Sequence, residues 1–183
     1  MLPNKYSFLA DIGTLPKMVA LGISLLGTKE IPGPKSNPTI LKMAADLGLT
    51  KDMYSNDDEA WCALVQSWIC VQSGKPLPFK GYDLLRARSF LKWGIPVPLG
   101  QEMLGDILVF KRPAGFHVGM YIAESKTTFA TMGGNQRNEY SIVEISKNHD
   151  RFIEARRLYA IGPPASVKKY IVDSTGKLST NEA

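Results

Sequence analysis

The sequence predicts an α+β fold in which N-terminal helices pack on a C-terminal antiparallel β-sheet. In the first half of the chain, apolar residues recur with the spacing of a helix face. From residue 105 the pattern changes to short runs rich in Val, Ile, Phe and Tyr, which turn residues separate at hairpin-like intervals. Helices followed by strands are typical of α+β folds, whereas alternation of the two would favour a parallel α/β sheet.

The chain is long enough for one domain with its own core. It has 183 residues, of which 44% are hydrophobic and 21% are charged, as in ordinary globular proteins. We place the domain at residues 14–162, after an irregular lead-in over residues 1–13. Residues 163–183 contain fewer apolar side chains and are expected to form a loosely docked or flexible tail.

Four segments of the chain are predicted to be helical. They cover residues 14–27, 39–49, 59–73 and 83–94. Thr14 and Pro16 suit the start of the first helix, and glycines suit the ends of the first, third and fourth. Before the third helix, Asn56 and Glu59 resemble a capping box. The apolar stripe of this helix consists of Trp61, Leu64, Val65, Trp68 and Ile69.

Five short runs after residue 105 are predicted to be strands of an antiparallel meander. They are GDILVF, HVGMYIAE, TTFATMGG, YSIVEIS and FIEARRLYA. Successive side chains of a strand face opposite sides of the sheet. In the second run the core-facing set is Val118, Met120 and Ile122, and the opposite set is His117, Gly119 and Tyr121.

The apolar and charged patterns argue against several classes of partner. No apolar run reaches the about 18–20 residues that span a bilayer, so we expect no stable membrane insertion. The longest run, 18–26, follows Asp11 and lacks a small-residue cleavage site, which favours an amphipathic helix over a signal peptide. The net charge of +5 comes from scattered basic residues, so we expect attraction to an acidic surface rather than nucleic-acid binding. The protein is expected to be a monomer.

The two cysteines are expected to be free thiols. Cys62 and Cys70 lie eight residues apart in the third predicted helix, about 12 Å along its axis, which is too far for a disulfide. Two cysteines and two histidines without a C-x-x-C pattern favour no metal site, and we expect no cofactor. Free thiols fit a reducing cytoplasm.

Cys62 is the candidate nucleophile. It lies in the first or second turn of the predicted helix, where the helix dipole and free N–H groups stabilise a thiolate. Its direction is about 100° from that of Trp61, so it need not face the core. Cys70 lies deep in the same helix beside apolar residues and is expected to be structural. The alternative for Cys62 is an inert buried thiol.

His117 is the candidate base, because a thiol nucleophile needs a group that takes its proton. It opens a predicted strand, and Gly119 on the same face leaves room for a close approach. His149 lies in a polar turn and is expected to be solvated. The alternative for His117 is a partly buried polar residue without a catalytic role.

Asn135 and Gln136 are the candidates for a third residue that orients the imidazole. They follow two glycines at the end of the strand that is expected to pair with the His117 strand. Asn135 is the first side chain beyond the glycines, and we expect it to accept from the imidazole N–H. Gln136 is the alternative, since its longer side chain reaches His117 if the glycines bend the backbone. A simple glycine-containing turn also explains the motif when it is taken alone.

In their order along the chain, these motifs resemble those of the NlpC/P60-like and CHAP-like cysteine peptidases. WC at a helix start, SFLKWG, GDILVF, HVGMYI and GGNQ follow one another within residues 25–160. The pattern is particularly similar to a phage and bacterial subfamily, whose first motifs are represented by Glu30, Gly33, Asn37, Pro38 and Ile40. The resemblance implies a papain-like NlpC/P60-type fold. It also implies a cysteine peptidase or amidase domain with Cys62 as nucleophile, His117 as base and Asn135 or Gln136 as third residue.

The resemblance further implies cleavage of amide bonds in peptidoglycan, as by a phage endolysin in host lysis. Such an enzyme would stay in the host cytoplasm until its release to the periplasm and cell wall. Trp61, Trp93 and Tyr121 would line the groove for the peptide, although Trp61 and Trp93 also fit a core. No separate wall-binding domain is visible, which suits a Gram-negative host with a thin wall.

Two other functions are compatible with the same residues. One is an antibacterial amidase toxin that is delivered into rival cells. The other is a non-catalytic wall-binding or virion structural protein of the same fold, against which the intact Cys, His and Asn/Gln set counts. The scissile bond also stays open between the amide that joins muramic acid to L-alanine and the amides within the peptide stem.

Overall fold

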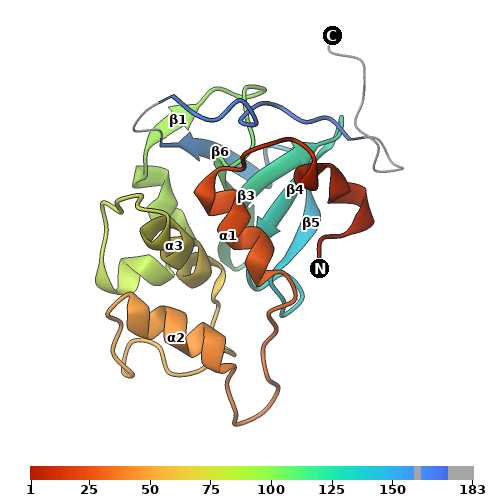
Figure 1. Ribbon diagram of the computed structural model, residues 1–183. Coiled ribbons are helices and arrows are strands. Elements are labelled where there is room, and N and C mark those ends of the chain that lie inside the picture. Colours follow the sequence, from red (N-terminus) through yellow and green to blue (C-terminus); the bar gives the residue numbers. More distant parts are fainter. Residues whose placement is uncertain (159–161, 173–183) are drawn as a thin grey trace.

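The computed structural model describes residues 1–158 and 162–172, and these have an α+β architecture (Figure 1). The helical elements are η1 (Asn4–Ala10), α1 (Lys17–Leu25), α2 (Pro38–Asp46), α3 (Cys62–Gln72), η2 (Gly81–Leu85) and η3 (Ala87–Lys92), where η denotes a 3₁₀ helix. The strands are β1 (Ile95–Val97), β2 (Ile107–Arg112), β3 (Gly115–Glu124), β4 (Thr128–Gly133), β5 (Ser141–Ser146) and β6 (Phe152–Arg157). The predicted order of helices and then strands is confirmed.

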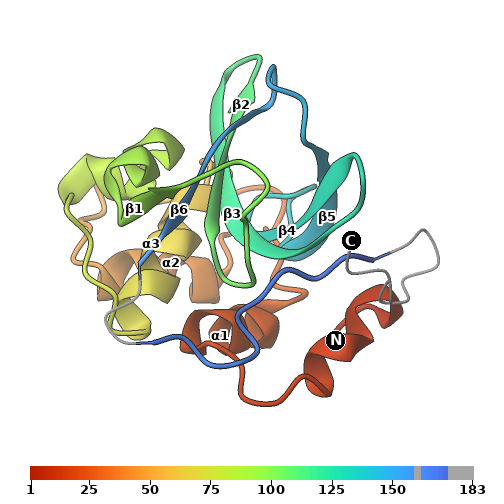
Figure 2. The same ribbon diagram turned by 90° about the horizontal axis from the view of Figure 1, so that it is seen from above.

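The strands form one antiparallel sheet in the order β1-β6-β2-β3-β4-β5. The sheet curls, so that the rings of Phe129 on β4 and Phe152 on β6 are only 4.9 Å apart although two other strands separate β4 from β6. Figure 2 shows the curl from above. The inner face of the curl carries Val97, Leu108, Phe110, Tyr121, Phe129, Phe152 and Ala155. The helices cover the other face, which holds the larger core.

The predicted first and second helices are present with shorter bounds. Helix α1 starts directly after Pro16, and Pro38 is the first residue of α2. The side chain of Asn37 caps α2, because it accepts a hydrogen bond from the Thr39 N–H at 2.8 Å. Proline suits the first position of α2, since an N–H there has no acceptor within the helix.

Helix α3 starts later than predicted, at Cys62 itself. The Asn56 side chain accepts from the N–H of Asp58 at 2.8 Å and closes a local turn, so the expected capping box is absent. All residues from Cys62 to Cys70 are buried except Trp68, which is half-buried and donates to Asp46. The helix packs against α1, α2, η2 and the inner strands β3 and β4, so its start is fixed relative to the sheet.

The predicted helix over residues 83–94 is wrong in type. Two 3₁₀ helices, η2 and η3, meet at Arg86, whose backbone is extended with φ −107° and ψ 111°. The hydroxyl of Ser67 in α3 donates to the Leu84 carbonyl at 2.9 Å. An α-helix would use that carbonyl for the N–H of residue 88, so the tertiary contact replaces a helical one.

Of the two forms predicted for the tail, loosely docked or flexible, the described residues up to Val172 take a docked one. The Glu124 N–H donates to the Tyr170 carbonyl at 2.8 Å, and the Val172 N–H donates back to Glu124 at 2.9 Å. Tyr170 and Val172 are buried, because they cover the end of β3 and the lead-in helix η1, where Phe8 stacks on Tyr170 at 5.1 Å. Residues 173–183 of the predicted tail lie outside the described part of the chain.

Candidate active site

The thiol of Cys62 lies at the first position of α3, beside strand β3. The backbone N–H groups of Cys62, Ala63 and Val118 lie near enough to its sulfur to lower the pKa of the thiol. Cys62 is only 4% exposed and is part of the larger core, so the expectation that it need not face the core is wrong. Burial raises the pKa of the Cys62 thiol, while the three N–H groups and the positive charge of Arg112 act in the opposite direction. At neutral pH Cys62 is therefore protonated, and the neighbouring N–H groups are placed to stabilise the thiolate when it forms.

Trp61 anchors the start of α3 to the N-terminal loops. Its indole N–H donates to the Glu30 carboxylate at 2.6 Å, and its ring lies against Gly134. The buried carboxylate of Asp57 accepts the N–H groups of Ile31 and Asn37 at 3.0 and 2.7 Å. These contacts explain the Glu30-to-Ile40 motifs structurally: they hold the loop that positions Cys62.

His117 is buried on the inner face of the curled sheet. In the β2–β3 register it lies opposite Phe110, and the two rings are 6.3 Å apart. The residue is 1% exposed, and this burial together with the nearby charge of Arg112 lowers the pKa of His117 to about 3. The imidazole is consequently neutral at pH 7.

Gln136, rather than Asn135, contacts the imidazole. Its Oε1 lies 3.1 Å from His117 Nε2. Its amide Nε2 donates to the carbonyls of Thr131, Gly133 and Ser141 at 3.3, 3.1 and 2.6 Å. Because three carbonyls hold the NH₂ group, the amide oxygen must face the histidine. The expectation that Asn135 makes this contact is therefore corrected, and the alternative holds.

The backbone after β4 does not follow the regular strand path on which the prediction of Asn135 depends. Asn135, Arg137 and Asn138 have left-handed φ values of 54°, 58° and 62°, so the chain does not continue as a strand. The Gln136 N–H donates to the Glu139 carbonyl at 3.0 Å, which closes a tight turn. Backbone bonds join this turn to residues 27–30 of the N-terminal loop. The turn directs Gln136 inward and leaves Asn135 half-buried at its rim.

Arg112 is the site residue that the sequence analysis missed. One guanidinium nitrogen lies 2.6 Å from His117 Nδ1. Because Nε2 carries the proton that Gln136 accepts, Nδ1 is the unprotonated nitrogen and accepts from Arg112. A signal was present, since the β2–β3 hairpin pairs Phe110 with His117 and places Arg112 diagonally on the same face.

The hydrogen bonds leave the thiol and the imidazole unjoined. Within the described residues, no hydrogen bond links Cys62 to either ring nitrogen of His117, because Arg112 and Gln136 occupy both nitrogens. Cys62 nevertheless lies beside Val118, the residue directly after His117. Cys62 thus belongs to the core on the helix side of β3, whereas the His117 ring lies on the inner face of the sheet, where Arg112 occupies its unprotonated nitrogen.

The aromatic residues expected to line a substrate groove are buried. Trp61, Trp93 and Tyr121 are 0%, 1% and 0% exposed, so none presents a surface to a ligand. The Tyr121 hydroxyl is held by Glu124 and the Tyr170 carbonyl, and the Trp93 indole donates to Pro76. The core interpretation of Trp61 and Trp93 is confirmed, and the groove expectation is wrong for all three. His149 is exposed, as predicted.

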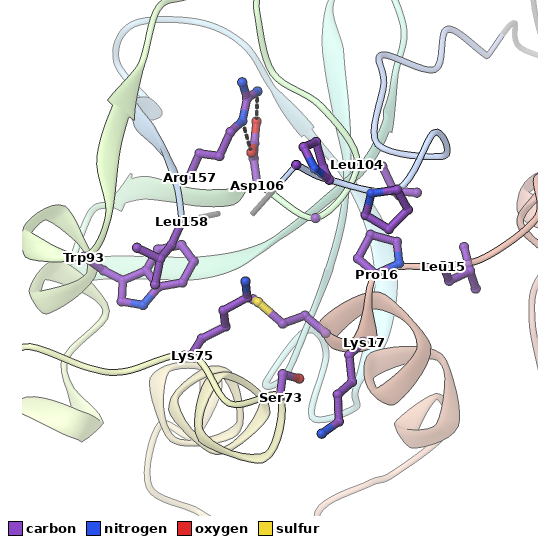
Figure 3. A pocket seen from close by; sticks show the side chains of 15 residues that line it. Leu15, Pro16, Lys17, Ser73, Lys75, Trp93, Leu104, Asp106, Arg157 and Leu158 are labelled. Carbon is purple, nitrogen blue, oxygen red and sulfur yellow. Dashed lines mark hydrogen bonds and ion pairs between the residues drawn. The ribbon is translucent and has the colours of Figure 1, made fainter. Parts of the chain in front are cut away.

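A cavity of about 310 Å³ lies away from Cys62, at the other end of α3 (Figure 3). Trp93, Lys75 and the Asp106–Arg157 ion pair are among its lining residues. Helix α3 has 11 residues and is about 16 Å long, so this cavity is remote from the thiol. A second pocket, of about 370 Å³, is instead lined by His117, Gln136 and Arg112.

The described residues contain no cluster of three His, Cys, Asp or Glu side chains arranged to hold a metal ion. Cys70 is buried in α3 and its sulfur accepts weakly from Gln66 at 3.9 Å. Burial raises the pKa of Cys70 to about 12, which fits the structural role predicted for it. None of the helices in the described part of the chain combines the length and apolar character that crossing a bilayer requires.

No family model matches this chain, and no curated protein matches it either. The chemistry of the site therefore rests on the geometry around Cys62 and His117.

Proposed function

We propose that this chain is a cysteine-dependent peptidoglycan hydrolase of papain-like NlpC/P60 type, which acts as a phage endolysin. The observation that carries the proposal is the Cys62 thiol at the first position of α3, surrounded by three backbone N–H groups and adjacent in space to Val118. The Gln136 clamp on His117 supports it, because an imidazole with a fixed tautomer is what thiol activation requires. The choice of peptidoglycan as substrate rests on the motif resemblance.

In the proposed reaction, His117 Nδ1 takes the proton of Cys62 and the thiolate attacks an amide carbonyl of the peptide stem. The helix-start N–H groups stabilise the oxyanion that forms. The protonated imidazole then donates its proton to the leaving amine, and a water molecule hydrolyses the thioester. Gln136 keeps the Nε2 proton in place throughout, so that Nδ1 alone exchanges protons.

A non-catalytic wall-binding protein is the second candidate, and the burial of the site favours it. The thiol is 4% exposed, its pKa is raised, and Arg112 rather than Cys62 contacts His117. In that case the chain would bind peptidoglycan without changing it.

A zymogram separates the two candidates. The wild-type protein is run through a gel that contains peptidoglycan, with and without prior treatment by iodoacetamide or EDTA. The proposed hydrolase gives a cleared band that iodoacetamide removes and EDTA leaves in place, because the thiol and imidazole need no metal. A pull-down with peptidoglycan and no clearing would support the binding protein. Clearing that EDTA abolishes and zinc restores would contradict the thiol mechanism.

A further inference from the structure

The pocket beside His117 is lined by three arginine side chains. It has a volume of about 370 Å³ and lies between the ends of β2 and β3, the turn after β4, and strand β5. Arg112 is half-buried, whereas Arg137 and Arg151 are exposed. Glu144 is the only acidic residue among the lining residues, and its carboxylate is held by Lys5 and the Thr128 hydroxyl. The pocket therefore carries excess positive charge.

None of the three guanidinium groups forms an ion pair with an acidic side chain in the described part of the chain. Arg112 instead donates to the neutral ring of His117 at 2.6 Å. A carboxylate is a stronger acceptor for a guanidinium than an imidazole, because the bond is charge-assisted and bidentate. An anion that entered the pocket would compete for Arg112.

We propose that the pocket binds a free carboxylate of the peptide substrate through Arg112, and that this binding draws Arg112 away from His117 Nδ1. The inference rests on the proposed function and names the feature of the substrate that switches the site on. Arg137 and Arg151 supply further positive charge at the pocket. Peptide stems of peptidoglycan present several free carboxylates near their amide bonds, so they match this chemistry.

Once Arg112 has left His117 Nδ1, this nitrogen is able to take a proton. With Arg112 on the carboxylate, the lone pair of Nδ1 accepts the Cys62 proton, the S–H bond breaks, and the electron pair stays on sulfur as thiolate. The pair of charges that forms, imidazolium and thiolate, needs no other reactant. Removal of the Arg112 charge from the ring also raises the pKa of His117, because that charge is one cause of its low value.

The test measures binding with hydrolysis blocked. Calorimetry is carried out on Cys62→Ala protein with a stem peptide whose carboxylates are free, and with the same peptide in which all of them are amides. We expect amidation to weaken binding about 10- to 100-fold, the range of a charge-assisted contact. In Cys62→Ala, Arg112→Gln protein this preference should fall to less than about 3-fold. Arg86→Gln removes a similar charge outside the pocket and should keep the preference.

A second readout guards against a folding defect. The titration of the His117 ring is followed by NMR, and its pKa should rise in the Arg112→Gln variant and also on addition of the free-carboxylate peptide. Equal binding of acid and amide by Cys62→Ala protein, with cleavage of both peptides by the wild type, would overturn the carboxylate site and leave the hydrolase intact. A preference of Cys62→Ala protein for the acid, with no cleavage of either peptide by the wild type, would keep the carboxylate site and overturn the hydrolase. An unchanged His117 titration in both experiments would overturn the displacement of Arg112.

Discussion

At the scale of the single residue, the buried neutral imidazole of His117 couples folding to pH. Its pKa is lowered to about 3, while a histidine in an unfolded chain has a pKa of about 6.5. Between these values the unfolded chain binds a proton that the folded chain does not bind. The contribution of His117 is therefore fully present above pH 6.5 and is lost as the pH falls toward 3.

We predict that the free energy of unfolding decreases by about 1.4 kcal/mol per pH unit below pH 6.5 because of this one residue. Urea denaturation of the wild-type protein and of His117→Gln at pH 7.5 and pH 5 measures the effect. The wild type should lose more stability than the variant over this range, since glutamine does not titrate. Equal losses in the two proteins would mean that His117 is not held neutral in the folded state.

Gln136 and Asn135 give a second test at the residue scale, because only Gln136 orients His117. Gln136→Ala should lower kcat by about 10- to 1000-fold, which corresponds to about 1.4–4 kcal/mol of lost transition-state stabilisation. Asn135→Ala should lower it less than about 5-fold. Steady-state assays on soluble muropeptides measure both. A larger loss in Asn135→Ala than in Gln136→Ala would reverse the assignment.

The sequence located the candidate residues better than it located their contacts. Helix position predicts Cys62 as the nucleophile, and strand alternation predicts His117 as the base. In the structure Cys62 lies beside Val118 of β3, and the His117 ring lies on the other face of that strand. The prediction of Asn135 depends on a regular strand end, whereas residues with left-handed φ values turn the chain there. Arg112 was missed because its role depends on a diagonal neighbour across a hairpin, which alternation along one strand does not show.

At the scale of secondary-structure elements, the contact between the turn after β4 and helix α3 positions Gln136. A Cβ atom on Gly134 would lie 2.6 Å from both the Trp61 ring and Val65. The close approach needs glycine for space, and it brings the turn against the residue that precedes Cys62.

Gly134→Ala should therefore lower the free energy of unfolding by about 1–3 kcal/mol, because α3 and the turn must separate. Gly162→Ala is the matched control, since a Cβ there meets no atom within 4 Å. Its stability should change by less than about 0.5 kcal/mol. Denaturation curves compare the two variants, and a Gly134→Ala protein as stable as the control would contradict the packing described.

The elements that the sequence predicted well are those with strong local signals. Proline marks the starts of α1 and α2, and each predicted run after residue 105 supplies one strand of the sheet within the described residues. The predicted meander is wrong at its end, because β6 pairs with β2 and β1 and not with β5. The errors have tertiary causes. Ser67 takes the Leu84 carbonyl where a helix was expected, and Trp61 is anchored by Glu30 from a distant loop, so α3 starts only at Cys62.

At the scale of the whole molecule, the C-terminal segment of the described chain packs against the N-terminal elements. The segment 162–172 runs between the sheet and the N-terminal elements (Figure 2). The sequence leaves the tail between a loosely docked and a flexible form, because a segment with few apolar residues gives no periodic signal. The segment buries a few side chains, among them Val167, Tyr170 and Val172. Backbone hydrogen bonds to Leu104 and Glu124 hold the segment in place.

Tyr170→Ala should lower the free energy of unfolding by about 2–4 kcal/mol, because the ring is buried against Phe8. Ile171→Ala provides an adjacent control, since this side chain is 36% exposed. Its cost should stay below about 1 kcal/mol. Urea denaturation of both variants measures the difference, and equal stabilities would show that the segment does not contribute to the fold as described.

Cys62 carries the central claim, and its matched control lies in the same helix. Cys70 is also buried but has no helix-start N–H groups around its sulfur. Comparing the two cysteine variants therefore distinguishes a catalytic role of the thiol from a role in packing. Wild-type, Cys62→Ala and Cys70→Ala proteins are each incubated with purified peptidoglycan, and the released muropeptides are identified by mass spectrometry. We predict one newly cleaved amide bond with wild-type and Cys70→Ala protein, and a loss of more than about 1000-fold in product with folded Cys62→Ala protein. Undiminished product from Cys62→Ala protein would contradict the account.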